Sequence, residues 1–305
     1  MLIHSEKHQL VIHSPAKLNL FLEILSKRSD GFHEIETLMT TVGLYDSLSF
    51  REILSDEITL TVQGVKEVSH QNSDIPGQNE VPVDQTNLVL RAANLLRNHS
   101  EKAHGVHIHL LKRIPIAAGL AGGSSNAAAT LIGLNRLWNL GLSLDELIQL
   151  SLQLGSDIPF FLSCAKSAIC RGRGEIIEPV SLMSGMNVVI AQPFTGNSTA
   201  DVYRNCRPSN QPRSVNSLVE SLRSGNSCQA KPYLFNALQK PATDLNSDVE
   251  KMSQLFTRLP FSVHMMSGSG SSYFGLCSNR GLALAMGQQV KMRHRGFVCV
   301  TQTGV

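Results

Sequence analysis

A run of small residues between a predicted strand and a predicted helix places the strongest constraint on this chain. The run occupies residues 115–126 and reads Pro-Ile-Ala-Ala-Gly-Leu-Ala-Gly-Gly-Ser-Ser-Asn. It follows a strand-like segment at residues 106–111 and leads into a helix-like segment at residues 126–134. A loop with few bulky side chains lets the backbone approach a ligand closely, and the following helix directs free N–H groups and its positive dipole end at that ligand. The run predicts a phosphate-binding loop; the structural alternative is a helix N-terminus whose small residues serve tight packing.

Two common phosphate-binding loops are excluded by the spacing of glycine and lysine. A P-loop requires Gly-x-x-x-x-Gly-Lys-Ser/Thr, and no lysine follows Pro115 within this run. A dinucleotide-binding fingerprint requires Gly-x-Gly-x-x-Gly. The two nearest segments fail at the third glycine, where Tyr273 and Ile177 stand. The loop is therefore of another type.

Composition indicates a globular protein with room for two domains. The chain has 305 residues, of which 42% are hydrophobic and 17% charged, and its net charge of +3 includes no long basic run. Neither a nucleic-acid partner nor a membrane span is indicated. Six cysteines without a Cys-x-x-Cys pair, together with an N-terminus too polar for a signal peptide, predict a cytoplasmic protein with reduced thiols. His107 and His109 share one strand face without a third ligand, which favours a solvated face over a metal site.

Periodicity predicts a mixture of strands and helices without regular alternation, which is typical of an α+β protein. Ser143 and Glu146 form a predicted capping box at the start of one helix. We expect a first domain at residues 1–178 and a second at residues 179–305. Strands are expected at residues 10–25, 37–49, 58–62, 106–111, 186–191 and 297–301, a strand and turn at 168–178, and a strand–turn–strand unit at 261–277. Helices are expected at 87–98, 126–138, 144–155, 248–259 and 282–292, and loops at 71–85 and 204–214.

Three polar residues are candidates for chemistry. Lys17 and Asn19 share one face of a strand that is otherwise apolar. A lysine there must reach either water, by snorkelling, or an anion. Asp157 follows a glycine that ends a helix and precedes Ile-Pro. It suits helix capping, but an aspartate can also accept the proton of a hydroxyl group during phosphoryl transfer.

The three candidates and the loop together resemble the GHMP kinases. The segment Ser-Pro-Ala-Lys-Leu-Asn-Leu at residues 14–20 is similar to the first motif of that family, residues 115–126 to the second, and Met-Met-Ser-Gly-Ser-Gly-Ser at residues 265–271 to the third. The motifs occur in the family's order and span nearly the whole chain. The resemblance implies a two-domain α+β fold, with an N-terminal domain like ribosomal protein S5 domain 2 and a C-terminal ferredoxin-like α/β sandwich.

The resemblance also implies roles for individual residues. Asp157 would be the general base and Lys17 would lie near it and the transferring phosphoryl group. ATP would be the phosphoryl donor, and Mg²⁺ would bridge its phosphate oxygens, with Ser124 as a candidate ligand. The residues implied in ATP binding are Asn87, Lys112, Pro115, Ile116, Ala117, Ala118, Gly119, Leu120, Ala121, Gly122, Gly123, Ser124 and Ser125.

Further segments resemble a branch of the family that acts on an alcohol linked to cytidine diphosphate. These segments are residues 28–33, which read Arg-Ser-Asp-Gly-Phe-His, and residues 154–160. Two aromatic rings can sandwich cytosine, with a stacking energy of about 1–3 kcal/mol for each base; core packing is the structural alternative for both rings. The residues implied in substrate binding are Asn19, Phe32, His33, Thr199 and Tyr203.

The chain departs from the family pattern in the loop. Ala117, Ala118 and Ala121 stand where glycine is common, and alanine disfavours positive φ. Phe32 stands where tyrosine is common in the family, and Tyr203 stands where phenylalanine is common, so each position keeps an aromatic ring. Two other functions stay open: a GHMP kinase for another alcohol, such as mevalonate or homoserine, and a nucleotide-binding module without catalysis. We expect a monomer or a weak homodimer.

Overall fold

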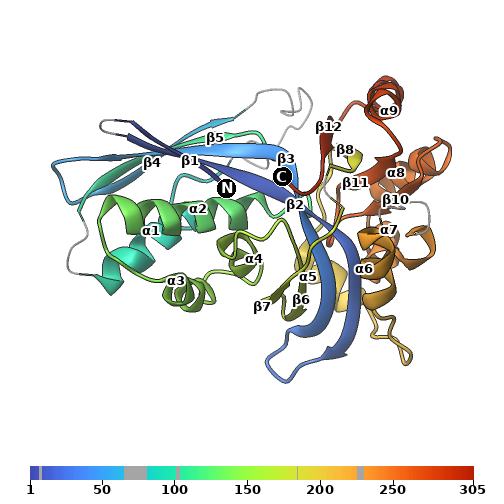
Figure 1. Cartoon of the computed structure of the whole chain (residues 1–305), viewed down its shortest axis with the longest axis horizontal. Helices are drawn as coiled ribbons and strands as arrows, with labels where there is room; N and C mark the ends of the chain where they lie inside the picture. Colours follow the sequence, from blue (N-terminus) through green and yellow to red (C-terminus); the bar gives the residue numbers. More distant parts are fainter. Residues whose placement is uncertain (7–8, 65–80, 101–103, 184, 225–229) are drawn as a thin grey trace. The chain divides into compact units, whose positions relative to one another are not determined.

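The chain forms two compact units, each built from separate segments (Figure 1). The computed structural model describes residues 1–6, 9–64, 81–100, 104–183, 185–224 and 230–305. The first unit comprises Met1–Ala16, Tyr45–Ile116 and Ala121–Cys164, and the second comprises Lys17–Leu44, Ala117–Leu120 and Ala165–Val305. The units do not follow the predicted division of the chain after residue 178. Two long strands and the small-residue loop each contribute residues to both units. The domain boundary at residue 178 stays a prediction.

Strands of the first unit form a mixed sheet in the order β1-β2-β3-β5-β4. The pairings are antiparallel between β1 and β2 and between β3 and β5, whereas β4 runs parallel to β5. The elements are β1 (Leu2–Glu6), β2 (Gln9–Lys27), β3 (His33–Glu52), β4 (Ile58–Gly64), β5 (Val106–Lys112), α1 (Leu88–His99), α2 (Gly122–Leu137), α3 (Leu144–Ser151) and α4 (Ile158–Leu162).

Helices α1 and α2 pack against each other along one face of this sheet (Figure 1). Small residues let α2 come close to the strands, because a Cβ built on Gly133 would lie 2.8 Å from the ring of Phe50. Ala127, Ala128 and Leu131 of α2 are fully buried. Helix α2 therefore has a fixed position, and so does its N-terminal end.

The second unit contains the C-terminal half of the chain and the adjoining parts of β2 and β3. Its elements include β6 (Ser167–Gly172), β7 (Ile176–Pro179), β8 (Asn187–Gln192), β9 (Phe235–Asn236), β10 (Val263–Met266), β11 (Tyr273–Cys277) and β12 (Phe297–Gln302). Its helices are α5 (Thr199–Asn205), α6 (Asn216–Arg223), the 3₁₀ helix η2 (Lys231–Tyr233), α7 (Gln239–Leu245), α8 (Ser247–Thr257) and α9 (Arg280–Arg293).

Four of these strands form an antiparallel sheet in the order β10-β11-β8-β12. Helices lie in the chain between β8 and β10 and again between β11 and β12. This succession of β-α-β-β-α-β is the ferredoxin-like arrangement. The predicted strand–turn–strand at residues 261–277 is confirmed as the β10–β11 hairpin.

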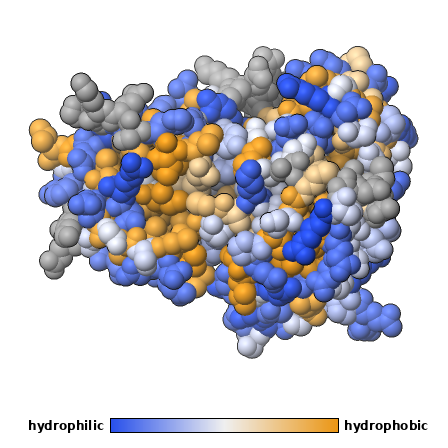
Figure 2. Space-filling model, viewed as in Figure 1, coloured by the Kyte–Doolittle hydropathy of each residue, from blue (hydrophilic) through white to orange (hydrophobic). Residues whose placement is uncertain are grey.

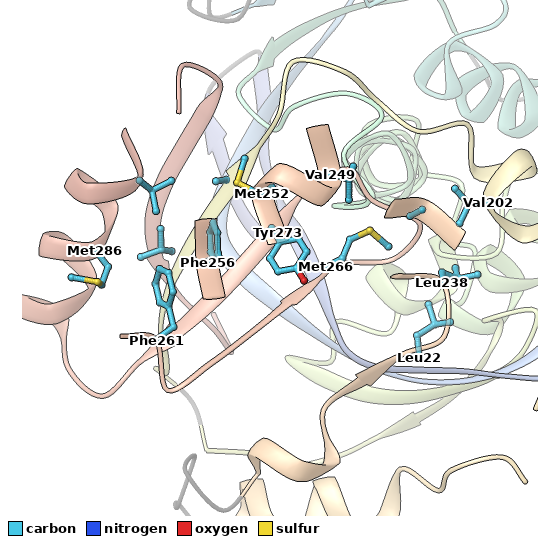
Figure 3. Packing of buried hydrophobic residues seen from close by; sticks show 14 of the residues in the cluster. Leu22, Val202, Leu238, Val249, Met252, Phe256, Phe261, Met266, Tyr273 and Met286 are labelled. Atoms are coloured by element: carbon cyan, nitrogen blue, oxygen red, sulfur yellow. The ribbon is translucent and has the colours of Figure 1, made fainter. Parts of the chain in front are cut away.

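Aromatic and methionine side chains fill the core between this sheet and its helices (Figure 3). The rings of Phe256 and Phe261 stack with centroids 4.8 Å apart, and Tyr273 packs beside them at 5.4 Å from Phe256. Met252 and Phe256 come from the predicted amphipathic helix, observed as α8. The core fixes the β10–β11 hairpin and therefore the turn that carries the third motif.

Most predicted elements of the described residues are confirmed within a few positions. Helix α2 begins at Gly122, four residues before the expected start, because the glycines and serines of the loop already adopt helical backbone. Both hydrogen bonds of the predicted capping box are present: the Ser143 side chain accepts from the Glu146 N–H, and the Glu146 side chain accepts from the Ser143 N–H. Of the loop expected at residues 71–85, residues 71–80 lie outside the described residues.

Candidate active site

The loop between β5 and α2 has an unusual backbone. Ala117, Gly119 and Ala121 all adopt positive φ, at 49°, 72° and 53°. Ala121 is the N-cap of α2 and its side chain makes no capping hydrogen bond. The first N–H groups of an α-helix have no acceptor within the helix, and alanine offers none from its side chain. This helix end therefore has the free donors that an anion needs.

Carbonyl groups of Gly119 and Leu120 in the loop accept hydrogen bonds within the second unit. The carbonyl of Gly119 accepts hydrogen bonds from Nζ of Lys17 and Oγ of Ser267, both at 3.0 Å. The carbonyl of Leu120 accepts one from the backbone N–H of Lys17 at 3.1 Å. In a planar trans peptide the carbonyl and the next N–H point in opposite directions. The N–H groups of Leu120 and Ala121 therefore point away from these partners.

Lys17 is buried on β2, with 4% of its surface exposed. Its ammonium group donates to Oδ1 of Asn19 at 2.6 Å as well as to Gly119. Of the two alternatives for Lys17, snorkelling to solvent is wrong, because both faces of β2 are buried here. A buried ammonium is costly without acceptors, and these two hydrogen bonds supply acceptors for it.

Asn19 connects Lys17 to two other segments. Its side-chain Nδ2 donates to Oγ1 of Thr37 at 2.8 Å, and its backbone N–H donates to Oγ of Ser267 at 3.2 Å. A Cβ built on Gly268 would lie 3.3 Å from Oδ1 of Asn19, from the Gly119 carbonyl and from Nζ of Lys17. The three motif segments thus meet around one ammonium group, and glycine leaves the room for them.

Asp157 belongs to the first unit, where it is the half-buried N-cap residue of α4. Its backbone is αR and its side chain makes no capping hydrogen bond. The helix-capping interpretation of this carboxylate is therefore wrong. Its role as a general base, and its pairing with Lys17, stay predictions.

The residues predicted to bind a base occupy the second unit. The rings of His33 and Tyr203 lie with centroids 5.4 Å apart at an angle of 40°. The ring of Phe32 is half exposed, and the guanidinium carbon of Arg173 lies 4.7 Å from its centroid. Burial, and then the charge of Lys27, lower the pKa of His33 and so favour its neutral imidazole.

Thr199, the fifth predicted substrate residue, is at the start of α5. Its Oγ1 lies 2.9 Å from Oγ of Ser269 in the turn of the third motif. Asn197 donates from Nδ2 to the Ser269 carbonyl at 3.1 Å. Thr199 and the third motif therefore share one hydrogen-bonded loop.

Asn87 and Lys112, predicted near the adenosine, both have partners within the first unit. Asn87 caps α1, where its Oδ1 accepts from Val89 N at 2.9 Å and its Nδ2 donates to the Pro82 carbonyl at 2.6 Å. Lys112 forms a buried ion pair with Asp46 at 2.7 Å. Burial lowers the pKa of Lys112, and Asp46 opposes that effect.

Sequence reasoning missed Asp46, which is completely buried. The available signal was its place in the strand: it alternates with Leu44 and Leu48, so a carboxylate stands on an apolar face. Such a residue requires buried donors.

Oxygen atoms at the start of α2 are compatible with a magnesium ion. Oγ of Ser125 is buried and has no hydrogen-bond partner among the described residues, and Ser124 precedes it in the same turn. Mg²⁺ prefers oxygen ligands and keeps several from phosphate or water. Within the described ranges, no group of three or more His, Cys, Asp or Glu residues could hold a metal. His107 and His109 hydrogen-bond to Thr61 on a neighbouring strand.

The class of protein follows from the loop, the three meeting motifs and the comparisons. Residues 87–164 match the family model described as GHMP kinases N terminal domain. The fold alone resembles that of L. major mevalonate kinase in complex with R-mevalonate, with a TM-score of 0.69 and 15% identity over 98% of this chain and 96% of that one. The chain is a GHMP kinase, and the predicted α+β fold of two domains is confirmed.

Closer relatives identify the branch. The 4-diphosphocytidyl-2-C-methyl-D-erythritol kinase of Bacillus cereus strain B4264 is 40% identical over 269 residues, 88% of each chain, and that of Bacillus cytotoxicus is 39% identical over the same share. A crystal structure of 4-(cytidine 5'-diphospho)-2C-methyl-D-erythritol kinase matches with a TM-score of 0.79 and 31% identity over 97% of this chain and 99% of that one. This chain belongs to the 4-diphosphocytidyl-2-C-methyl-D-erythritol kinase family.

None of the described helices has both the length and the apolar character needed to cross a membrane. The face of the molecule in Figure 2 carries polar and charged residues among its apolar ones.

Proposed function

We propose that this chain transfers the γ-phosphoryl group of ATP to the 2-hydroxyl of 4-diphosphocytidyl-2-C-methyl-D-erythritol, in the non-mevalonate route to isoprenoid precursors. The products are the 2-phosphate and ADP. Identity of 40% over 88% of the chain supports the substrate. The observation that carries the chemistry is the meeting of Lys17, the Gly119 carbonyl and the Ser267 turn, because it presents one ammonium group beside a loop with outward N–H groups.

Asp157 would accept the proton of the 2-hydroxyl while the oxygen forms a bond to the γ-phosphorus and the bond to ADP breaks. A carboxylate can accept the proton of a hydroxyl group in this step. An alcohol is a weak acid, so proton transfer is late, and positioning and electrostatics supply most of the rate. Lys17 would stabilise negative charge on the transferring group.

Residues 115–125 would bind the ATP phosphates through backbone N–H groups, with Asn87 and Lys112 on the adenosine side. Mg²⁺, which neutralises phosphate charge when bound, would be held by Ser124 and the phosphate oxygens. Phe32, His33 and Tyr203 would hold the cytosine, and Asn19 and Thr199 the remainder of the substrate. A cytoplasmic location and a monomer or weak homodimer stay predictions of the sequence.

Two other functions are distinguished by one assay. A kinase for mevalonate or homoserine would have no base to stack, so Phe32, His33 and Tyr203 argue against it. A non-catalytic nucleotide-binding module would not need both Lys17 and Asp157. Purified protein with MgATP should release ADP with the cytidyl alcohol and with neither other alcohol. Turnover of mevalonate alone would reject the proposal, and ATP binding without turnover of any alcohol would favour the module.

Substitution of Asp157 by asparagine tests the base. The change is nearly isosteric, so substrate binding should persist while kcat falls by about 10²–10⁴-fold, as is usual for removal of a general base. A near-normal kcat in this variant would reject the assignment.

A further inference from the structure

The carboxylate of Asp46 on β3 accepts four hydrogen bonds although it is fully buried. Its Oδ1 accepts from the backbone N–H groups of Arg113 at 2.6 Å and Ile114 at 2.8 Å. Its Oδ2 accepts from Nζ of Lys112 at 2.7 Å and Nδ2 of Asn126 at 2.9 Å. A buried carboxylate with this many donors holds each of them in a defined place.

The four donors come from the two ends of the phosphate-binding loop. Lys112 ends β5, and Arg113 and Ile114 follow it and directly precede Pro115, whereas Asn126 lies in the first helical turns of α2. Asn126 is held on its other side as well, because Oγ of Ser14 donates to its Oδ1 at 2.7 Å. One side chain of a different strand therefore connects the residues that enter the loop to the residues that leave it.

The ammonium of Lys112 lies against the start of α2. It also donates to the carbonyl of Ile114, and a Cβ built on Gly122 would lie 2.9 Å from its Nζ. Only 8% of the surface of Lys112 is exposed to solvent. Any loss of its partner would leave a buried charge at the first turn of this helix, and the turn would have to shift to solvate it.

We propose that Asp46 and Lys112 are positioning residues that set the spacing between the end of β5 and the first turn of α2, and so hold the loop in the shape that binds ATP phosphates. This inference rests on the proposed function, since it assumes that the loop binds ATP. Any effect of Lys112 on ATP is then indirect, because its ammonium group is buried and paired with Asp46 and acts through the loop rather than by contact with the adenosine. A purely structural pair would contribute stability alone, and its loss would leave the ATP site of the folded molecules unchanged.

The test compares a single and a double variant. Asp46→Asn places an amide N–H₂ opposite Lys112 and Asn126, which both donate, so it should lower the melting temperature and raise the KM for ATP by about 10-fold. Asp46→Asn combined with Lys112→Met removes the buried charge and should recover most of the melting temperature. The KM for ATP should stay raised in the double variant, while the KM for the cytidyl alcohol should change by less than about 2-fold.

Leu147→Ala in α3 is the matched control, because Leu147 is buried at 4% exposure on a different helix of the same unit and carries no polar group. It should lower the melting temperature without a change in either KM. Ser14→Ala, which removes only the hydrogen bond to Asn126, keeps the ion pair and should fold; it should raise the KM for ATP by about 2–3-fold. A wild-type KM for ATP in the double variant, or an equal rise in Leu147→Ala, would overturn the proposal.

A binding measurement separates this inference from the proposed function. If the wild-type protein does not phosphorylate the cytidyl alcohol, the proposed function fails, but the thermal shift caused by MgADP still reports on the loop. That shift should be largely lost in the double variant and retained in Leu147→Ala. An equal shift in wild-type and double-variant proteins would reject the positioning role.

Discussion

Lys17 donates a hydrogen bond of 2.6 Å to Asn19, the residue two positions further along the same strand. Side chains two apart on a strand share one face, so this pair can form without any other segment. Both residues are buried, at 4% and 1% exposure. The amide oxygen thus holds the ammonium group, while the amide nitrogen is held by Thr37. The pair fixes a positive charge beside the Gly119 carbonyl.

Replacement of Asn19 by leucine should lower both the free energy of unfolding and kcat. The buried ammonium would lose an acceptor, which costs about 1–3 kcal/mol or more for a charged group, and its direction would no longer be fixed. Urea unfolding measures the first effect and kcat the second. Thr37→Val is the control, since it leaves the acceptor of Lys17 in place. It removes the partner of the Asn19 amide nitrogen and the hydrogen bond from Oγ1 of Thr37 to the Phe21 carbonyl, and it should cost about 0.5–1.5 kcal/mol for each hydrogen bond lost. Equal stability of Asn19→Leu and wild type would contradict the finding.

Replacement of Gly119 by alanine should remove most of the activity. Gly119 has a φ of 72°, and a Cβ there would lie 2.1 Å from the Ser267 carbonyl oxygen, so the loop must move. A misplacement of about 1 Å near reacting groups can cost about 10²-fold in rate. We expect a fall in kcat of that size, measured by ADP release.

Gly141→Ala provides the comparison for Gly119→Ala. Gly141 has nearly the same φ, 73°, but nothing lies within 4 Å of a Cβ built there. It should cost about 1 kcal/mol through backbone strain alone and leave kcat unchanged. A kcat for Gly119→Ala as high as that of Gly141→Ala would show that the contact with Ser267 has no effect on the site.

The elements that the sequence predicts well are those determined by neighbouring residues. Ser143 and Glu146 lie three positions apart and form their capping box locally. The small residues of the loop and the start of α2 are likewise a local signal. Strand β9 was not predicted, because its two residues, Phe235 and Asn236, become a strand only by pairing with β2.

The contacts that define the candidate site are not local and were harder to predict. Lys17 binds Gly119 across 102 residues, and Asp46 binds Asn126 across 80. Strand alternation identified Lys17 as a polar residue among apolar neighbours, but it could not decide between solvent and a buried partner. Resemblance to a family supplied residue roles, whereas burial and hydrogen bonds come only from the tertiary structure.

The lowered pKa of His33 predicts how substrate binding depends on pH. Burial and Lys27 place this pKa below the ordinary 6.5, so the folded protein binds fewer protons than the unfolded chain near pH 6.5. The contribution to stability is therefore complete above pH 6.5 and is lost as the pH falls through 6.5 towards the lowered pKa. The KM for the cytidyl alcohol should be constant from pH 8 to pH 6.5 and rise only below it, because neutral imidazole both donates and accepts.

Lys27→Met tests the cause of this dependence. Removal of the lysine charge should raise the pKa of His33, so the rise in KM should begin at a higher pH than in the wild type. The KM for ATP at each pH serves as the control, because His33 is assigned to the cytosine. An unchanged profile in Lys27→Met, or a parallel change in both KM values, would contradict the assignment.

Substitution of the loop alanines by glycine should stabilise the protein at two positions and destabilise it at the third. Ala117 and Ala121 have positive φ, which costs an L-residue about 1–2 kcal/mol. Glycine relieves that strain but adds entropy to the unfolded chain, so a net gain of about 0.5–1 kcal/mol is expected for each. Ala118 lies between them without positive φ and is buried at 3% exposure. Ala118→Gly should therefore lose about 0.5–1 kcal/mol. Urea unfolding of the three variants gives the comparison, and a loss of stability in Ala117→Gly equal to that in Ala118→Gly would show that the loop is not strained at Ala117.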